Sequence, residues 1–259
     1  MKNILYFIFI SLFIAISCSK SDGGSSDVGG VPVNDQGQAG SMAKFSISGD
    51  YIYLINDQNL STYDISQANT PVEVGSKRLD FGIETVFTLK ERLFIGSING
   101  MYIFDISDPA NIQKLSFYEH ITSCDPVVAN DSLAFVTLSS GNQCRWGGGA
   151  NRLDVLDITN ELEPELLSSM NMISPKGLGL YQNYVFVCNS QQGVEIYDYT
   201  DPSDLEKVAR IQAVDAYDLI IRGDHLFLIG KDGLFQYRIN QVEDIELISE
   251  FPFYITTTP

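Results

Sequence analysis

One pattern that recurs about every 41 residues constrains this chain more than any other feature. It is plainest in the stretches GMYIFDISDP (Gly100–Pro109) and GVEIYDYTDP (Gly193–Pro202). Five segments align on it, at 60–66, 101–107, 153–159, 194–200 and 234–240. Their Asp column reads Asp64, Asp105, Asp157, Asp198 and then Arg238, at intervals of 41, 52, 41 and 40. A repeat of this length indicates one small structural unit built several times over.

A second column lies upstream of the first and gives the same period. Its anchors are Tyr53, Phe94, Phe135, Phe186 and Phe227, at intervals of 41, 41, 51 and 41. The extra residues of the third unit therefore follow Phe135 and precede Asp157. They form an insertion, residues 139–151, between the second and third strands of that unit.

Each repeat supplies four short strand candidates, and a sustained helical periodicity is absent. In the second unit the candidates are 82–90, 91–97, 100–107 and 112–120, separated by turn pairs such as Asn99-Gly100 and Asp108-Pro109. Apolar residues are consecutive in the middle strands, as in Leu93-Phe94-Ile95, so both faces of a sheet must be buried.

We therefore predict an all-β fold, a five-bladed β-propeller of four-stranded blades covering residues 41–259. An open solenoid is the structural alternative. Closure into a ring is favoured because it covers the apolar blade faces without end caps, and no capping segment is evident in the sequence.

The Asp column has a structural interpretation. An Asp at a strand end, followed by Ser or Thr, bonds its carboxylate to nearby backbone N–H groups in a turn. Residues spread around five blades also do not converge on one site. The fifth unit departs from the pattern, with Arg238 in the Asp column and no Pro after it.

The N-terminus reads as an export and lipidation signal. Lys2 precedes the apolar run 4–17, which is shorter than the roughly 20 residues of a membrane span and fits the core of a signal peptide at 1–17. Ala15–Cys18 resembles a bacterial lipobox, with Ala15 where Leu is usual, and predicts a lipid on Cys18. The alternative is an ordinary secretory signal with an incidental Cys. Residues 18–40, rich in Gly, Ser and Asp, are predicted to be a flexible tether.

The net negative charge of the chain limits the classes of partner that it can bind. The formal net charge is −17, which argues against nucleic acid and against a basic patch on anionic lipid. The excess of acidic residues can serve to keep the protein soluble through mutual repulsion of its copies. Alternatively, it indicates affinity for cations or for a basic partner. The expected partners are the membrane, through the N-terminal lipid, and an envelope protein or glycan.

The stretches MYIFDISDP and VEIYDYTDP resemble the repeat of the LVIVD family, bacterial exported proteins expected to form β-propellers. The resemblance runs from about Ser41 to Phe253. The third unit also resembles lipoproteins of this family from Bacteroidetes-type bacteria. The resemblance implies a propeller and a location at the outer membrane, on either its periplasmic or its outer side, but it brings no activity with it.

Propeller topology brings separate loops to one rim. The loop before a blade's first strand, here called the leading loop, opens on the same side as the loop between the second and third strands. Cys124 and Cys144 are thereby predicted on one rim of the third blade, where an exported protein would join them in a disulfide of about 3 kcal/mol. Two free thiols are the alternative. Cys188 ends a strand and is expected to be a small buried hydrophobe.

The insertion holds the single Trp of the chain beside an Arg, the residue types that dominate protein interfaces. We expect this rim to be the recognition surface, unless Trp146 folds back onto the propeller. The candidate residues of this leading-loop rim are Glu84, Asp125, Arg145, Trp146, Lys176, Asp215 and Tyr217.

No catalytic, metal-binding or cofactor motif stands out. His120 and His225 lack ligand partners at useful spacing, and no phosphate loop or nucleophile elbow occurs. The surviving enzyme hypothesis is glycoside hydrolysis by two carboxylates at the axial cavity, drawn from Glu84, Asp125 and Asp215. The sequence therefore predicts a non-catalytic binding or scaffolding module without cofactor, or alternatively a glycoside hydrolase-like enzyme.

Overall fold

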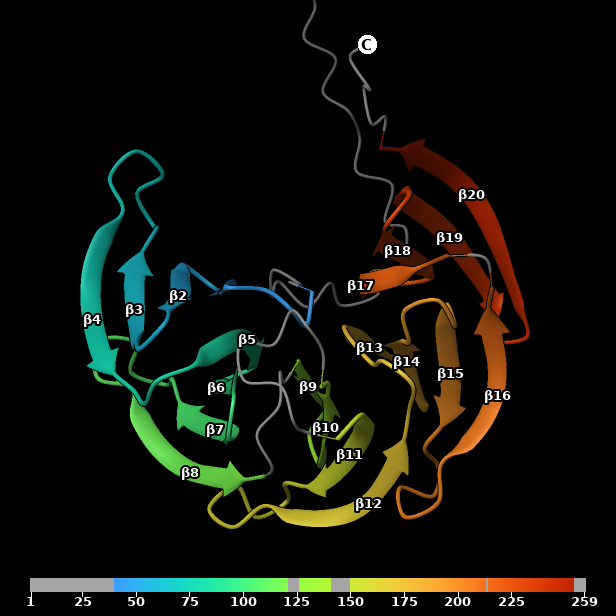
Figure 1. The fold of residues 1–259 in the computed structure, drawn as a ribbon. Helices are drawn as coiled ribbons and strands as arrows, with labels where there is room; N and C mark the ends of the chain where they lie inside the picture. The colour runs from blue at the N-terminus through green and yellow to red at the C-terminus, as the bar shows by residue number, and fades with distance from the viewer. Residues whose placement is uncertain (1–39, 121–125, 141–149, 213, 254–259) are drawn as a thin grey trace, which may run out of the picture. The chain divides into compact units, whose positions relative to one another are not determined.

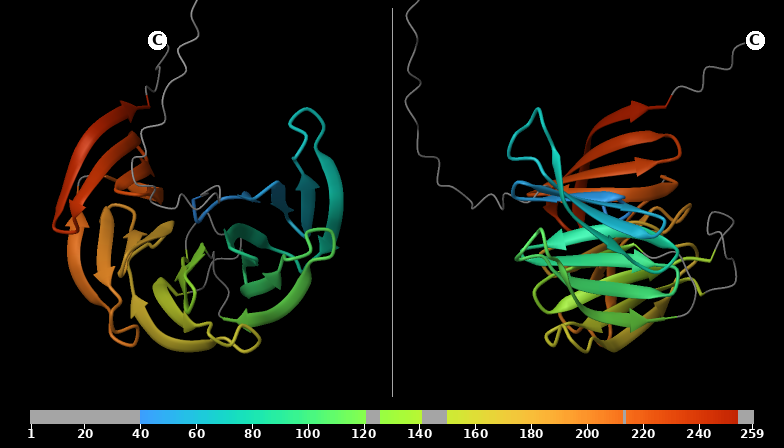
Figure 2. Two further views of the ribbon diagram at one scale, coloured as in Figure 1. Left: turned by 180° about the vertical axis from the view of Figure 1, so that it is seen from behind. Right: turned by 90° about the vertical axis from the view of Figure 1, so that its left-hand side faces the viewer.

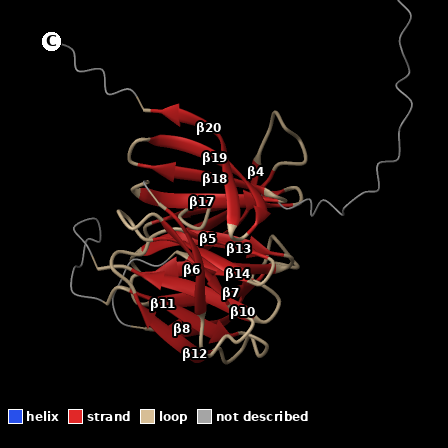
Figure 3. Cartoon of the chain, turned by 90° about the vertical axis from the view of Figure 1, so that its right-hand side faces the viewer, coloured by secondary structure: helices blue, strands red, loops and turns tan. Residues whose placement is uncertain are grey.

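The computed structural model describes residues 40–120, 126–140, 150–212 and 214–253. The chain divides into two units, 1–34 and 35–259, and the described residues all belong to the second. The predicted signal peptide, lipidated Cys18 and tether therefore lie outside the described residues. Where it is described, the chain forms strands joined by loops and turns, as Figure 3 shows.

Within the described residues, twenty strands make five sheets of four strands each, which confirms the predicted number and size of the blades. Sheet 1 contains β1 (Phe45–Ser48), β2 (Tyr51–Asn56), β3 (Asn59–Asp64) and β4 (Val72–Arg78). Sheet 2 contains β5 (Ile83–Leu89), β6 (Arg92–Ser97), β7 (Gly100–Asp105) and β8 (Gln113–Glu119). Sheet 3 contains β9 (Val127–Ala129), β10 (Leu133–Leu138), β11 (Arg152–Asp157) and β12 (Glu165–Asn171).

Sheet 4 contains β13 (Leu178–Tyr181), β14 (Tyr184–Cys188), β15 (Val194–Asp198) and β16 (Glu206–Ile211). Sheet 5 contains β17 (Ala216–Arg222), β18 (His225–Gly230), β19 (Gly233–Gln241) and β20 (Asp244–Pro252). In every sheet the strands pair antiparallel in chain order. The first strand of each sheet lies innermost and the fourth outermost (Figure 1).

The sheets share a bulge that the sequence pattern did not predict. Each third strand shifts register against its fourth strand at one equivalent point, two residues before the Asp column: Thr62, Ile103, Val155, Ile196 and Gln236. The extra residue lies in the fourth strand. A bulge of this kind bends its strand and increases the local twist, consistent with the curved outer strands in Figure 1.

Neighbouring sheets pack face to face in sequence order, through contacts made mainly by the inner strands β1, β5, β9, β13 and β17. Side chains alternate between the two faces, so one strand serves two interfaces. In β6, Leu93 and Ile95 join the cluster shared with sheet 1, whereas Phe94 joins the cluster shared with sheet 3. The prediction that both faces of a middle strand are buried is confirmed here.

The predicted closure of the ring is not present. Sheets 1 and 5 stand apart (Figure 1, and from behind in Figure 2), and each leaves one apolar face uncovered. The physical reason is that closure depends on the angle between successive sheets, which a strand pattern does not specify. The fold is all-β and propeller-like, with five blade-like sheets in series.

Sheet 5 is regular despite its divergent sequence. Arg238 lies in the middle of the long strand β19, because that strand continues past the point where the other third strands end. A tight connection to β20 replaces the longer Asp-containing loop, and Asn240 Nδ2 donates to Asp244 Oδ2 at 3.2 Å. The loss of the Asp and Pro signals therefore changed the hairpin and not the sheet.

Candidate functional site

The leading-loop rim is the natural place to look for a site, because loops from different sheets meet there. Leading loops and second-to-third loops do contact one another. Ser190, which follows β14, pairs with Ala216 at the start of β17. A side chain at Gly82, before β5, would collide with Ile98, which lies between β6 and β7. The predicted topology of this rim is thus observed.

Two of the predicted rim residues are direct neighbours. Lys176 precedes β13 and Tyr217 lies in β17, yet the Lys176 Nζ atom is 4.0 Å from the centre of the Tyr217 ring. The backbone draws them together, since Gly177 N–H donates to the Tyr217 carbonyl at 2.9 Å. A cation held over a phenol ring in this way presents charge and aromatic surface side by side.

One half-buried acidic group near this rim, Asp218, was not singled out from the sequence. Asp218 Oδ1 accepts from the Ser41 hydroxyl at 3.1 Å, and Oδ2 accepts from the Met42 N–H at 3.3 Å. The Ser41 hydroxyl in turn accepts from the Leu178 N–H at 2.7 Å. This group of contacts, here called the Asp218 latch, joins the residues before β1 to sheets 4 and 5.

Two glycines make room for the carboxylate in the latch. A Cβ atom at Gly40 would lie 2.2 Å from Asp218 Oδ2, and one at Gly177 would lie 2.0 Å from Oδ1. Any larger residue at either position would displace the carboxylate. The close approach shields one side of the carboxylate from water, and the Asp218 residue is half-buried.

Burial decides the ionisation of this group. Removal from solvent raises the pKa of Asp218 to about 6, and the hydrogen bonds from Leu219, Met42 and Ser41 only partly oppose that rise. The nearby Cys188 thiol is fully buried, and its burial together with the Asp218 charge raises its pKa well above the usual value. Cys188 is buried, which confirms the prediction that it is a small buried hydrophobe.

A second buried carboxylate, in β15, is held by three donors. Glu195 accepts from Asn189 Nδ2 at 2.6 Å, from the Tyr197 hydroxyl at 3.1 Å and from Lys207 Nζ. Burial alone would raise the pKa of Glu195, but these hydrogen bonds outweigh it and lower the pKa below its usual value. Asn189 also accepts from the Ser174 N–H at 2.8 Å, so the network fixes the loop that leads into sheet 4.

The remaining predicted rim residues divide into two groups. Glu84 and Asp215 are half-buried at the starts of sheets 2 and 5, and nothing in their described contacts brings them together. The others, and the proposed disulfide, lie outside the described residues: Cys124, Asp125, Cys144, Arg145 and Trp146. The insertion that holds three of them lies between β10 and β11, as predicted.

The opposite rim carries the Asp column. In four sheets the Asp carboxylate accepts from the N–H two residues on, at 2.7–2.8 Å, in the pairs Asp64–Ser66, Asp105–Ser107, Asp157–Thr159 and Asp198–Thr200. These hydrogen bonds lower the pKa of each of the four Asp side chains. The interpretation of the column as turn chemistry is confirmed.

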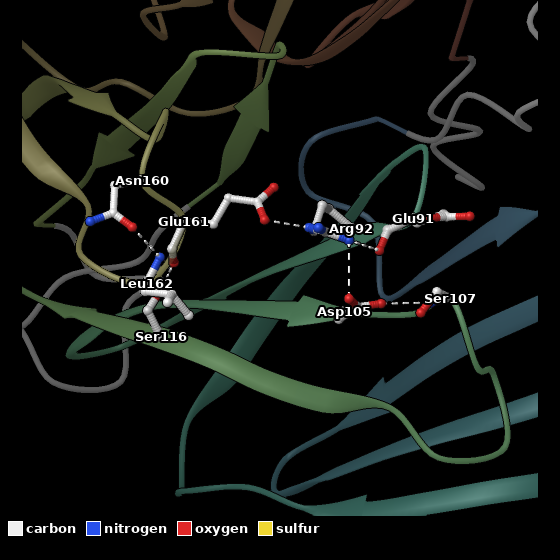
Figure 4. Close-up of polar contacts among 8 residues, drawn as sticks. All are labelled: Glu91, Arg92, Asp105, Ser107, Ser116, Asn160, Glu161 and Leu162. Carbon is white, nitrogen blue, oxygen red and sulfur yellow. Dashed lines mark hydrogen bonds and ion pairs between the residues drawn. The ribbon is translucent and has the colours of Figure 1, made fainter.

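A cleft of about 560 Å³ opens on this second rim, between sheets 2 and 3. Arg92 lies at its edge, with Nε bonded to Glu161 Oε2 at 2.6 Å and Nη1 3.4 Å from Asp105 Oδ2 (Figure 4). The volume of the cleft is in the range of small-ligand pockets. The residues that line it are Leu89, Lys90, Glu91, Arg92, Phe94, Asn130, Asp131, Ile158 and Glu161.

Five of the charged groups at this cleft are paired with one another: Arg92 with Asp105 and Glu161, and Lys90 with Asp131. Arg92 bridges two carboxylates, and Lys90 Nζ lies 2.5 Å from Asp131 Oδ1. Glu161 is also tied through its backbone, since the Ser116 hydroxyl donates to its carbonyl at 2.6 Å. The arrangement clamps sheet 2 to sheet 3.

Sequence reasoning missed the latch and the cleft for identifiable reasons. Ser41 and Asp218 are 177 positions apart, and neither belongs to a repeat column. Gly40 and Gly177, one directly before Ser41 and the other at the end of a leading loop, are the only local signals of a close approach. Arg92 follows a turn in the second repeat, where its charge is typical of a solvated strand end.

The described part of the chain was also compared with the requirements of a metal site and of a membrane-spanning helix. It contains no group of three or more His, Cys, Asp or Glu side chains arranged to hold a metal ion. Nor does any described segment form a helix long and apolar enough to cross a membrane.

Comparisons with known proteins agree with the fold. The LVIVD repeat family matches residues 39–78 and 93–118, which correspond to sheet 1 and to most of sheet 2. Among curated proteins, none matches the sequence significantly. The match supports the resemblance to LVIVD repeats over these two segments, and the second stretch that suggested it, residues 194–202, lies outside them.

Several solved structures share the architecture at low identity. A functionally unknown protein from Desulfotomaculum acetoxidans DSM 771 aligns with a TM-score of 0.66 and 12% identity, over 81% of this chain and 69% of its own. A protein from Lactobacillus plantarum gives 0.63 and 12%, over 77% and 67%. BamB from Moraxella catarrhalis gives 0.55 and 12%, over 73% of this chain and 56% of its own. This chain aligns with between 56% and 69% of the length of these three proteins. At such low identity, the similarity establishes the fold alone.

Proposed function

We propose that this chain, whose first two sheets are similar to LVIVD repeats, is a non-catalytic binding or scaffolding module of the bacterial cell envelope. A lipid on Cys18 would hold it to the outer membrane, and residues 18–40 would give the sheets reach. The partner is an envelope protein or a glycan, bound at the leading-loop rim.

The observation that carries this proposal is that internal donors occupy three carboxylates of the described residues, of which Asp154 and Glu195 are buried and Asp218 is half-buried. Asp218 is held by Ser41 and Met42, and Glu195 by three donors. Asp154, almost fully buried, accepts from Arg152 and from Ser169. Because acid–base catalysis needs a carboxyl group able to reach a substrate proton, groups committed to internal donors support binding over catalysis.

The leading-loop rim offers the recognition chemistry. Lys176 and Tyr217 place a cation and an aromatic ring together, and Arg145 and Trp146 belong to the insertion between β10 and β11. Arg, Tyr and Trp are the residue types enriched at binding hot spots.

The test is retention of envelope proteins and glycans by the purified chain, immobilised through its C-terminus. We expect Lys176→Ala and the Arg145→Ala/Trp146→Ala variant to reduce retention by about tenfold or more, as loss of a hot spot does. Arg222→Ala is the matched control, because it removes one exposed positive charge at the β17–β18 turn on the opposite rim. Equal losses in all three variants would refute binding at the leading-loop rim, and release of cleaved sugar would refute a non-catalytic role.

The anchor is tested separately by fractionation. We expect the wild-type chain in the membrane fraction and Cys18→Ser in the soluble fraction, since a multiply acylated Cys supplies the more than one chain that stable anchoring needs. A Cys18→Ser protein that stays with the membrane would remove the lipid from the proposal.

A further inference from the structure

The two uncovered faces of sheets 1 and 5 are the two halves of one missing interface. Each sheet has a forward face, which packs on the next sheet, and a backward face, which packs on the preceding one. Four hydrophobic clusters fill the four interfaces among the described sheets. The series leaves over the backward face of sheet 1 and the forward face of sheet 5.

The backward face of sheet 1 is apolar in the same way as its buried equivalents. Phe45 and Leu54 pair across β1 and β2, and their side chains are 50% and 40% exposed. The repeat places Leu54 in register with residues of sheets 2–5 that are at most 1% exposed: Ile95, Val136, Val187 and Leu228. Phe45 corresponds to residues that are at most 2% exposed: Val86, Val127, Leu178 and Leu219. Only the cover is missing from sheet 1.

The forward face of sheet 5 is also apolar, and no following sheet packs on it. Ile229, Leu234 and Phe251 lie side by side across β18, β19 and β20. Ile229 is 40% and Phe251 61% exposed. Ile229 is in register with Cys188, and its neighbour Phe227 with Phe186, both of which are fully buried against sheet 5.

We propose that a second copy of this chain covers these faces, with sheet 5 of one copy packed head-to-tail on sheet 1 of another. The contact would continue the sheet-to-sheet interface that the chain already forms four times. Each copy carries both complementary halves, so no other partner chemistry has to be assumed. Two copies that contact each other reciprocally would cover all four faces in a closed dimer.

The charge of the chain shapes the expected behaviour. Because the net charge is −17, copies repel one another at long range. The apolar centre of each face carries no such charge: Phe45, Ile47, Ile52 and Leu54 on one side, and Phe227, Ile229, Leu234 and Phe251 on the other. Association should therefore strengthen as salt screens the repulsion, the opposite of an interface held by ion pairs.

A complementation experiment tests the geometry. Sedimentation velocity would be measured on the full chain carrying Cys18→Ser, so that an attached lipid does not itself drive association. Leu54→Lys places a charge in one face and Ile229→Asp in the other, and each alone should weaken self-association by about 100-fold. An equimolar mixture should associate again, because sheet 5 of the first variant and sheet 1 of the second are both intact.

The control is Leu162→Lys, which adds the same charge at an exposed Leu outside both faces and should leave association unchanged. A reference chain that stays monomeric up to about 100 µM, the range of weak association, would overturn the proposal: the faces are then covered within one chain or by a foreign sheet. A chain that associates while the mixture stays monomeric would also overturn it, since the contact then lies elsewhere. The inference does not depend on the proposed function, and loss of rim binding would leave it standing.

Discussion

The same residue type performs opposite tasks in this protein, according to its surroundings. Asp105 and Asp198 sit at exposed strand ends, where backbone and side-chain donors two residues on lower the pKa. Asp218 lies half-buried in the latch, where removal from solvent raises its pKa to about 6. A carboxylate that caps a turn favours the ionised form, whereas the latch tolerates it at a cost.

That cost predicts a dependence of stability on pH. The folded pKa of Asp218 lies above its usual value of 3.8, so between about pH 4 and pH 6 the folded state holds more protons than the unfolded state. The contribution of this group to stability is therefore full at low pH and is lost as the pH rises through about 6. At roughly 1.4 kcal/mol per pKa unit, the loss amounts to about 2–3 kcal/mol.

The measurement is the free energy of unfolding in urea from about pH 4.5 to pH 7.5. The stability of wild type relative to Asp218→Asn should fall across this window by about 2 kcal/mol, because the amide does not ionise and about 1.5 of the shifted pKa units lie above pH 4.5. Asp198→Asn is the control: its pKa is lowered, so the carboxylate's contribution is lost only below about pH 4 and the difference should stay flat. A flat difference for Asp218→Asn would show that the group titrates normally.

At the scale of the element, glycine and the bulge define each blade. Glycine begins the third strands of sheets 2 and 5 and directly precedes that of sheet 4. At these three positions a Cβ atom would lie 2.0–2.4 Å from a carbonyl of the fourth strand: Gly100, Gly193 and Gly233. This contact explains the first letter of the repeated stretches at Gly100 and Gly193. The end of the third strand is equally regular. In every sheet, the residue after the Asp column donates its N–H to a backbone carbonyl in the turn between the first and second strands: Ile65, Ile106, Ile158, Tyr199 and Ile239.

Gly193→Ala should be far more destabilising than an ordinary glycine substitution. Gly193 combines a φ of +81° with a Cβ position 2.0 Å from the Ile211 carbonyl oxygen, whereas Gly49 has a φ of +55° and open space around it. We expect a loss of about 1 kcal/mol for Gly49→Ala, from backbone strain alone. For Gly193→Ala we expect more than about 3 kcal/mol, because a backbone atom must also move.

Urea denaturation of both variants checks this difference. Similar losses in the two variants would mean that the start of β15 relaxes freely and that the glycine is not required there.

At the scale of the whole molecule, the order of the sheets decides how much each core residue contributes. Phe186 and Phe227 occupy the same position of the repeat. Phe186 is buried between sheets 4 and 5, whereas Phe227 lies on the uncovered face of sheet 5. Their energetic contributions should therefore differ although their sequence contexts are alike.

In dilute protein, Phe186→Ala should cost about 3–5 kcal/mol of stability, as for a fully buried aromatic side chain. Phe227→Ala should cost less than about 2 kcal/mol, because water already reaches its face. Thermal and urea unfolding at low protein concentration measure both. Equal costs would indicate that sheets 1 and 5 close on each other within one chain.

The sequence by itself determined the units of this protein. Two columns of residues fixed the number of blades, the four strands of each and the place of the insertion, because strand pairing and turn chemistry are local and repeat with the chain. The same columns placed Lys176 and Tyr217 on one rim. Only the tertiary structure decided that the ring stays open, that Ser41 reaches Asp218, and that Arg92 bridges two sheets. Those outcomes depend on the angles between sheets and on contacts across most of the chain, which no local pattern encodes.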